Sequence, residues 1–240
     1  DHRQQAGLGT DTVPGAKALY LPLVTSSRTV GVLGILPGSS PGMFDPEQMQ
    51  LHIRLVPGGK FTGHVFNGMK EGDVLQVEGP YGSFYLREES SKPIIFMSGG
   101  CGFGAVKGMV EHAFNIGLKR PMTLYWGARI PADLYSDLPG KWMQEHENFK
   151  FIPVMSEQKP EHDWHGRTGL VTEAILQDYQ ELSGYQVYAC GSPEMVAAGR
   201  KAFMTKGLPE DQFFSDVFLD NKHVSSPIDS LVSSEGVTHD

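Results

Sequence analysis

The stretch Ile94-Ile95-Phe96-Met97-Ser98-Gly99-Gly100-Cys101-Gly102-Phe103-Gly104 joins a short apolar run to four glycines within six residues. The apolar run predicts a buried strand, and residues 105–116 after it show a helical pattern that ends at Gly117. Glycine lets the backbone approach a diphosphate closely, and a helix N-terminus offers free N–H groups to an anion. The stretch therefore predicts a nucleotide site. Its spacing departs from G-x-G-x-x-G, and a tight turn without a ligand explains it equally well.

The chain from Lys92 onward alternates between strand-like and helical stretches. Because such alternation builds a parallel sheet with helices on both faces, we predict an α/β fold with a five-stranded parallel nucleotide-binding sheet. A truncated β-rich region precedes this sheet, and residues 219–240 are expected to form a flexible tail. The predicted strands are 94–97, 122–126, 149–155, 186–189 and 212–217, and the predicted helices are 105–116, 133–146 with a break at Pro139-Gly140, 171–178 and 193–206.

Length, charge and cysteine content limit the class of protein. The 240 residues suit one or two domains, and a formal net charge of −8 argues against a nucleic-acid partner. No apolar run has the length of a membrane span and no leader pattern opens the chain, so no membrane partner is expected. Two cysteines are too few for a disulfide framework or a four-thiolate iron–sulfur cluster. We expect no metal site, and a reducing, cytoplasmic setting.

Residues 1–50 contain two β-like runs, 18–24 and 29–36, that suit a hairpin, and a helix start at 45–47. This part resembles the end of the GAF domain in potassium-responsive (Kdp-type) sensor histidine kinases. The first half of that domain and the kinase are missing, so no phosphotransfer is implied. We expect a GAF-like fragment whose hairpin pairs with the open edge of the β region after it. The similar segments are 7–12, 18–23, 30–34 and 45–48.

Residues 51–90 predict a small β-rich domain. By themselves these patterns indicate no function. The predicted elements are a strand at 52–56, a turn at 57–59, a helix at 60–69, and strands at 73–78 and 83–86, joined by a turn at 79–82.

From about Leu51 to Phe218 the chain resembles the ferredoxin–NADP reductase superfamily, in particular the reductases that serve oxygenases and deoxysugar-forming dehydratases. The resemblance implies a partial FAD-binding β-barrel over 51–90 and an NAD(P)H-binding α/β domain over 91–218. The motifs that carry it, in the order of the family, are His52-Ile53-Arg54 with 57–62, then 70–73, 79–84, 99–104, 124–129, 166–169 and 188–195.

The resemblance also implies a reaction. In the family, hydride passes from the nicotinamide to FAD, and single electrons then leave for a partner. We therefore expect an NAD(P)H-dependent flavin oxidoreductase. No iron–sulfur module follows, so the electrons would go to a separate oxygenase, a ferredoxin-like protein or a small acceptor. The alternative is a nucleotide-binding sensor or interaction module without turnover.

For FAD, the resemblance points to the turn before the predicted helix at 60–69. Gly58, Gly59 and Thr62 would supply backbone donors and a hydroxyl to the diphosphate, although a plain capped turn would use the same residues. Phe218 corresponds to an aromatic position near the flavin, and packing in the core is an equal alternative.

For the dinucleotide, the resemblance points to the carboxyl edge of the sheet, where open α/β sheets bind ligands. Cys101 and Cys190 would lie near the nicotinamide, although a cysteine that ends a strand is also a common small buried hydrophobe. Asp133 would favour NADH and Arg129 NADPH. The similar loop of related reductases favours NADH, and Asp133 is an equally good helix N-cap. The other expected contacts are Gly99, Gly100, Gly102, Gly191, Pro193 and Met195.

The chain departs from the family in two places that bear on the cofactors. The R-x-Y-S motif, which holds the flavin, is absent, and neither Arg28 nor Arg54 has its context. In the glycine stretch, Cys101, Gly104 and Ala105 stand where the family has threonine, alanine and proline. A thiol is a weaker hydrogen-bond donor than a hydroxyl, and the lost proline makes the turn less rigid.

Overall fold

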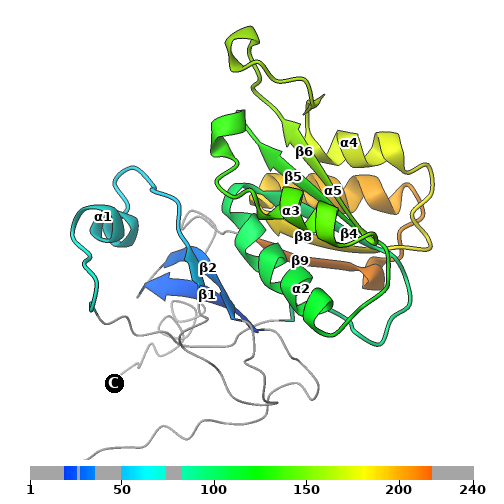
Figure 1. Cartoon of the computed structure of the whole chain (residues 1–240), viewed down its shortest axis with the longest axis horizontal. Helices are drawn as coiled ribbons and strands as arrows, with labels where there is room; N and C mark the ends of the chain where they lie inside the picture. The colour runs from blue at the N-terminus through cyan, green and yellow to red at the C-terminus, as the bar shows by residue number, and fades with distance from the viewer. Residues whose placement is uncertain (1–18, 26–27, 36–49, 74–82, 218–240) are drawn as a thin grey trace, which may run out of the picture.

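The computed structural model describes residues 19–25, 28–35, 50–73 and 83–217. Figure 1 shows a large α/β unit and, beside it, a small sheet with one helix. The predicted helix start at 45–47, the turn at 79–82, most of the strand at 73–78, Phe218 and the tail lie outside the described residues.

The large unit is built on a parallel six-stranded sheet with the order β7-β6-β5-β4-β8-β9. From β4 the chain adds strands outward on one side, and it then returns to place β8 on the other side of β4. The crevice between β4 and β8 is therefore the point where the strand order reverses. The strands are β4 (Ile94–Gly99), β5 (Met122–Ala128), β6 (Phe149–Met155), β7 (Arg167–Thr168), β8 (Gln186–Gly191) and β9 (Phe213–Val217).

The predicted parallel sheet is confirmed, but the predicted count of five strands is wrong by one. The additional strand, β7, has two residues, which pair with Val154 and Met155 at the end of β6. A strand of this length has no hydrophobic period of its own, so the sequence pattern cannot reveal it.

Helices cover both faces of the sheet (Figure 1). One core contains Phe96, Trp126 and Tyr188 from the strands and lies under α2 (Phe103–Asn115) and α3 (Leu138–Glu145). The other core lies under α4 (Val171–Asp178) and α5 (Pro193–Met204) and contains Met97 and Tyr125. β4 alternates its side chains between the two cores, as a strand buried on both faces must.

Two elements differ from the sequence prediction in this unit. The stretch 133–146 is a short 3-10 turn, η3 (Pro131–Asp133), followed by α3 (Leu138–Glu145). Pro139 lies in the first turn of α3, where its missing N–H costs nothing, so it does not break the helix. Residues 83–86 form no strand; Phe84 and Leu86 are buried, and Arg87 N–H donates to Tyr188 Oη at 2.9 Å.

The small sheet has the order β1-β2-β3 and is antiparallel. The predicted hairpin is confirmed as β1 (Leu19–Thr25) and β2 (Arg28–Ile35), and β2 pairs with β3 (Gln50–His52), as expected for the hairpin and the region after it. β3 ends at His52, so the predicted strand at 52–56 is wrong beyond its first residue. Helix α1 (Lys60–Asn67) follows the turn at Gly58 and Gly59.

In the described ranges, every helix is too short or too polar to cross a bilayer.

Candidate functional site

A cleft of about 1410 Å³ opens at the carboxyl ends of β4, β5, β6 and β8. Residues 50–55, from β3 and the segment after it, and Phe66 of α1 line the opposite wall. A volume of this size exceeds the roughly 300–1,000 Å³ of a pocket for one small molecule. The cleft therefore has room for parts of two ligands, one against each wall.

The glycine turn predicted from the sequence forms one end of the cleft. It is a 3-10 turn, η2 (Gly100–Gly102), and Gly100 has φ +51°, a conformation that favours glycine. Trp126 Nε1–H donates to the carbonyl of Gly100 at 3.1 Å and fixes the turn against β5. Gly100 and Cys101 line the cleft. Gly102 is buried, and a Cβ there would lie 2.2 Å from the carbonyl oxygen of Cys190, so this glycine lets α2 approach β8.

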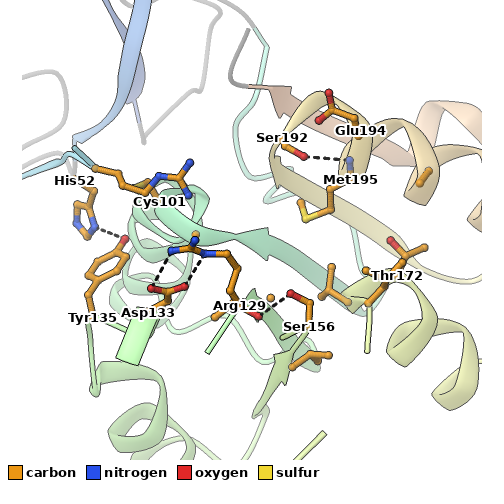
Figure 2. Close-up of a pocket in the computed structure, with 18 of the residues that line it drawn as sticks. His52, Cys101, Arg129, Asp133, Tyr135, Ser156, Thr172, Ser192, Glu194 and Met195 are labelled. Atoms are coloured by element: carbon orange, nitrogen blue, oxygen red, sulfur yellow. Dashed lines mark hydrogen bonds and ion pairs between the residues drawn. The ribbon is translucent and has the colours of Figure 1, made fainter. Parts of the chain in front are cut away.

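Gly99 and Gly191 face each other across the crevice between β4 and β8. A Cβ on Gly191 would lie 3.3 Å from the Cα of Gly99, and both glycines touch Met195, whose side chain lines the cleft. Met195 N–H donates to the N-cap hydroxyl of Ser192 at 3.3 Å (Figure 2). Pro193 occupies the first turn of α5. The structure thus brings together the sequence-predicted Gly99, Gly191 and Met195.

Arg129 and Asp133 lie together at the end of β5, where both line the cleft. Arg129 Nε–H donates to Asp133 Oδ2 at 3.0 Å, as Figure 2 shows. Asp133 ends η3 and does not cap α3, whose N-cap position is Asp137, so the N-cap alternative is wrong. The paired carboxylate neutralises the arginine, which is 62% exposed and is the more accessible partner.

The two cysteines occupy different environments. Cys101 lines the cleft, and burial raises the pKa of its thiol, while the nearby Arg54 guanidinium opposes the shift. Cys190 is fully buried in the core under α2, and burial, followed by Asp216, raises the pKa of its thiol well above the ordinary range. Since Cys190 does not line the cleft, its contact with a nicotinamide stays a prediction.

The turn predicted to bind the FAD diphosphate lies at the start of α1. Gly58 has φ +73° and open space where a Cβ would stand, which suits close approach of a ligand. The Thr62 hydroxyl accepts from Val56 N–H at 3.1 Å and donates to Val56 O at 3.3 Å, and a Cβ on Gly59 would lie 2.6 Å from it. These bonds make Thr62 a structural cap of the turn, and its part in FAD binding stays a prediction.

Sequence reasoning missed several groups at the cleft. Arg54 is exposed, and its Nη1 would lie 3.6 Å from a Cβ on Gly100, so its charge faces the glycine turn. His52 Nδ1 and Tyr135 Oη are hydrogen-bonded at 2.8 Å. Ser98 Oγ, beneath the turn, is buried without a hydrogen-bond partner among the described residues. The signal in the sequence was the motif His52-Ile53-Arg54, which carried the family resemblance without a role for each residue, and the contacts themselves span distant segments.

Two family models match the chain. The model described as "Oxidoreductase NAD-binding domain" matches residues 96–201, and "Oxidoreductase FAD-binding domain" matches residues 40–85. The second match begins before Leu51, inside the part expected to be a GAF-like fragment. That fragment and its boundary stay predictions.

Relatives with curated names agree with these matches. The chain is 41% identical to the CDP-6-deoxy-L-threo-D-glycero-4-hexulose-3-dehydrase reductase of Yersinia pestis over 215 residues, which are 87% of this chain and 63% of that protein. It is 41% identical to Protein RfbI of Salmonella typhimurium over 176 residues, 73% of this chain and 52% of the relative. The chain thus spans between half and two thirds of the length of these relatives.

A shorter relative is matched over most of its length. The chain is 32% identical to the NAD(P)H-flavin reductase of Aliivibrio fischeri over 206 residues, which are 83% of this chain and 84% of the relative. Among solved structures, the Amycolatopsis cytochrome P450 reductase GcoB has a TM-score of 0.67 and 28% identity, over 86% of this chain and 70% of that one. The chain therefore belongs to the ferredoxin–NADP reductase superfamily.

Proposed function

We propose that this protein is an NAD(P)H-dependent flavin oxidoreductase that delivers electrons to a separate acceptor. The observation that carries the proposal is the cleft, whose walls come from the NAD-binding sheet on one side and from residues inside the FAD-binding match on the other. FAD, when bound, supplies the chemistry by which two electrons accepted as a hydride leave one at a time. The protein's part is to hold two cofactors face to face in one cleft.

NAD(P)H fits the wall made by the sheet. Gly100 lines the cleft without a side chain, so that a dinucleotide can approach the backbone of the glycine turn, and Gly99 and Gly191 leave the space that the Met195 side chain occupies between β4 and β8. Arg54 offers a cation to a phosphate near Gly100. At the far end of the cleft, Asp133 would accept from ribose hydroxyls while it neutralises Arg129, which supports a preference for NADH.

FAD fits the opposite wall in part. Residues 53–55 have no regular secondary structure and line the cleft, and Gly58 leaves open space for a diphosphate. The acceptor is proposed to be an oxygenase component, a ferredoxin-like protein or a small molecule, by analogy with relatives named as reductase components. A cytoplasmic setting stays part of the proposal, since two cysteines suit a reducing compartment.

The test starts from a visible spectrum of the purified full chain, followed by titration with FAD and then NADH under anaerobic conditions. The expected result is saturable FAD binding, bleaching of the flavin band by NADH, and NADH oxidation when ferricyanide is added. NADH binding without any oxidation at saturating FAD would refute the reductase and support a nucleotide-binding module. Binding of neither cofactor would refute both functions.

A matched pair of arginine variants tests the site itself. Arg54→Gln removes an exposed charge that faces the glycine turn, and we expect dinucleotide affinity to fall about 10-fold or more, the effect of a charge-assisted hydrogen bond. Arg200→Gln removes an exposed arginine of α5 that pairs with Glu210 away from the cleft, and it should leave affinity unchanged. Equal affinities in both variants would remove Arg54 from the site.

A further inference from the structure

We propose that His52 and Tyr135, with Gly104 beneath them, form a latch that sets the position of the FAD-side wall of the cleft relative to the NAD-binding sheet. We call these three residues the latch. The proposal rests on the function proposed above, because it assigns a positioning role for hydride transfer to residues outside the expected cofactor contacts.

The first part of the latch is a hydrogen bond between the small sheet and the large α/β unit. His52 ends β3, and Tyr135 follows η3 after β5, 83 residues later. His52 Nδ1 lies 2.8 Å from Tyr135 Oη, and the two rings meet edge to face with centroids 5.6 Å apart (Figure 2). A tyrosine hydroxyl can donate or accept, so this bond suits either tautomer of the imidazole. It joins the small sheet directly to the loop that carries Asp133.

The second part is a slot in α2. A Cβ on residue 104 would lie 2.8 Å from Cγ and 2.9 Å from Cβ of His52, closer than side chains pack. Gly104 therefore leaves the space in which the His52 ring rests, with Phe103 edge-on at 6.2 Å. This contact gives a physical reason for the glycine at a position where the family resemblance implies alanine. The glycine also lowers the helix propensity at this position.

The third part is the connection from the latch to the nucleotide turn. The Tyr135 ring packs edge-on against Trp126, with centroids 5.1 Å apart, and Trp126 donates to the carbonyl of Gly100. On the other side, His52 is followed directly by Ile53 and Arg54, which line the cleft. A shift of the latch would therefore move Arg54 and residue 55 relative to Gly100. Misplacement of reacting groups by about 1 Å can cost about 100-fold in rate.

The test uses four variants of the full chain. Tyr135→Phe removes the hydroxyl and keeps the ring. His52→Leu removes the imidazole, and His52→Asn retains a polar group near the Nδ1 position. Gly104→Ala closes the slot without touching either hydrogen-bonding group. Gly140→Ala in α3, where a Cβ would meet nothing within 4 Å, is the control for adding a methyl group to a helix.

The first readout is amide hydrogen exchange of residues 28–35 and 50–55 without cofactors. Loss of one net hydrogen bond should speed exchange about 2- to 10-fold in Tyr135→Phe and His52→Leu. His52→Asn should recover most of that loss. The same residues should also exchange faster in Gly104→Ala, although the added methyl group favours the helix. Their exchange in Gly140→Ala should match the wild type. Exchange in Tyr135→Phe and Gly104→Ala at the wild-type rate would overturn the latch.

The second readout is single-turnover flavin reduction by NADH, with the NADH dissociation constant measured separately. The latch predicts that Tyr135→Phe and Gly104→Ala lower the reduction rate at least 10-fold and change NADH affinity less than twofold. Faster exchange with an unchanged reduction rate would overturn the positioning role. A wild-type protein that reduces no flavin would refute the proposed function. The exchange data would still decide whether the latch joins the small sheet to the large unit.

Discussion

At the residue scale, the two thiols should differ sharply in reactivity, because only a thiolate is alkylated quickly. Burial raises the pKa of both, but Cys101 lines the cleft beside Arg54 whereas Cys190 is fully buried. At pH 7.5 we expect iodoacetamide to label Cys101 slowly and Cys190 not at all, as measured by intact mass and peptide mapping. Arg54→Gln should slow the labelling of Cys101 further, since the cation that favours its thiolate is lost. Rapid labelling of Cys190 in the folded protein would contradict this account.

The burial of His52, also a property of a single residue, predicts that the stability of the fold depends on pH. Burial, followed by the charge of Lys107, lowers the pKa of His52 from its ordinary value of 6.5. Well above pH 6.5 the ring is neutral in both states. As the pH falls through 6.5, the unfolded chain binds a proton that the folded chain takes up only at lower pH, so stability falls as pH decreases. The urea midpoint should therefore drop between pH 7.5 and pH 5.5.

The matched variants for this pH effect are His52→Asn and Lys107→Gln. The asparagine cannot titrate, so the drop of the midpoint should shrink. Removal of the Lys107 charge should raise the pKa of His52 toward 6.5 and shrink the drop as well. A wild-type drop that neither substitution reduces would assign the effect to other groups.

At the scale of elements, Gly102 shows how one residue sets the distance between α2 and β8. A Cβ there would lie 2.2 Å from the oxygen and 2.6 Å from the carbon of the Cys190 carbonyl, which is backbone and cannot rotate away. Gly102→Ala should lower the free energy of unfolding by about 1–3 kcal/mol or more, the cost of overpacking. Gly140→Ala, in open space, should instead raise it by up to about 1 kcal/mol. Urea denaturation measures both, and equal stabilities would contradict the close approach.

The elements that the sequence predicted best are those with a strong pattern of their own. The strand at 149–155 and the helix at 171–178 have the predicted bounds, because their apolar residues face the two cores. Residues 83–86 alternate like a strand yet form none. Their buried side chains pack against distant residues: Phe84, for example, lies with its ring centroid 6.2 Å from that of Tyr188. Local alternation cannot reveal a partner about 100 positions away.

At the scale of the whole molecule, the position of the cleft could be predicted and its composition could not. A parallel sheet binds at its carboxyl edge, so the glycine turn was predictable from its place after a strand, and the family resemblance pointed to Arg129 and Met195. The opposite wall depends on how the small sheet lies against α2, which no local pattern encodes. His52 and Tyr135 are separated by 83 residues, and although His52 lies in a motif of the family resemblance, nothing in the sequence pairs it with Tyr135. Cys190 illustrates the reverse case, since its place at a strand end suggested the site and its side chain points into the core.

One buried arginine binds residues 83–92, the described segment that leads into β4 of the large unit. Arg120, 7% exposed, donates to Lys92 O at 2.6 Å, to Arg87 O at 2.7 Å and to Gln186 Oε1 at 2.6 Å. Arg120→Met would leave the carbonyls of Lys92 and Arg87 without this donor, at about 1–3 kcal/mol for each one that stays buried, whereas Gln186 Oε1 keeps the Tyr188 hydroxyl at 3.3 Å. We therefore expect a loss of at least about 2 kcal/mol of unfolding free energy and faster amide exchange across residues 83–92.

Two further arginine variants serve as comparisons for Arg120→Met. Arg120→Lys keeps the charge but cannot reach three acceptors with a planar fork, so it should recover less than half of the lost stability. Arg200→Met breaks an exposed pair with Glu210 and should cost less than about 1 kcal/mol. Urea denaturation of the three variants at one pH gives the comparison. If Arg120→Met were as stable as Arg200→Met, residues 83–92 would be held by their apolar contacts, such as Phe84 and Leu86, and the arginine would be dispensable.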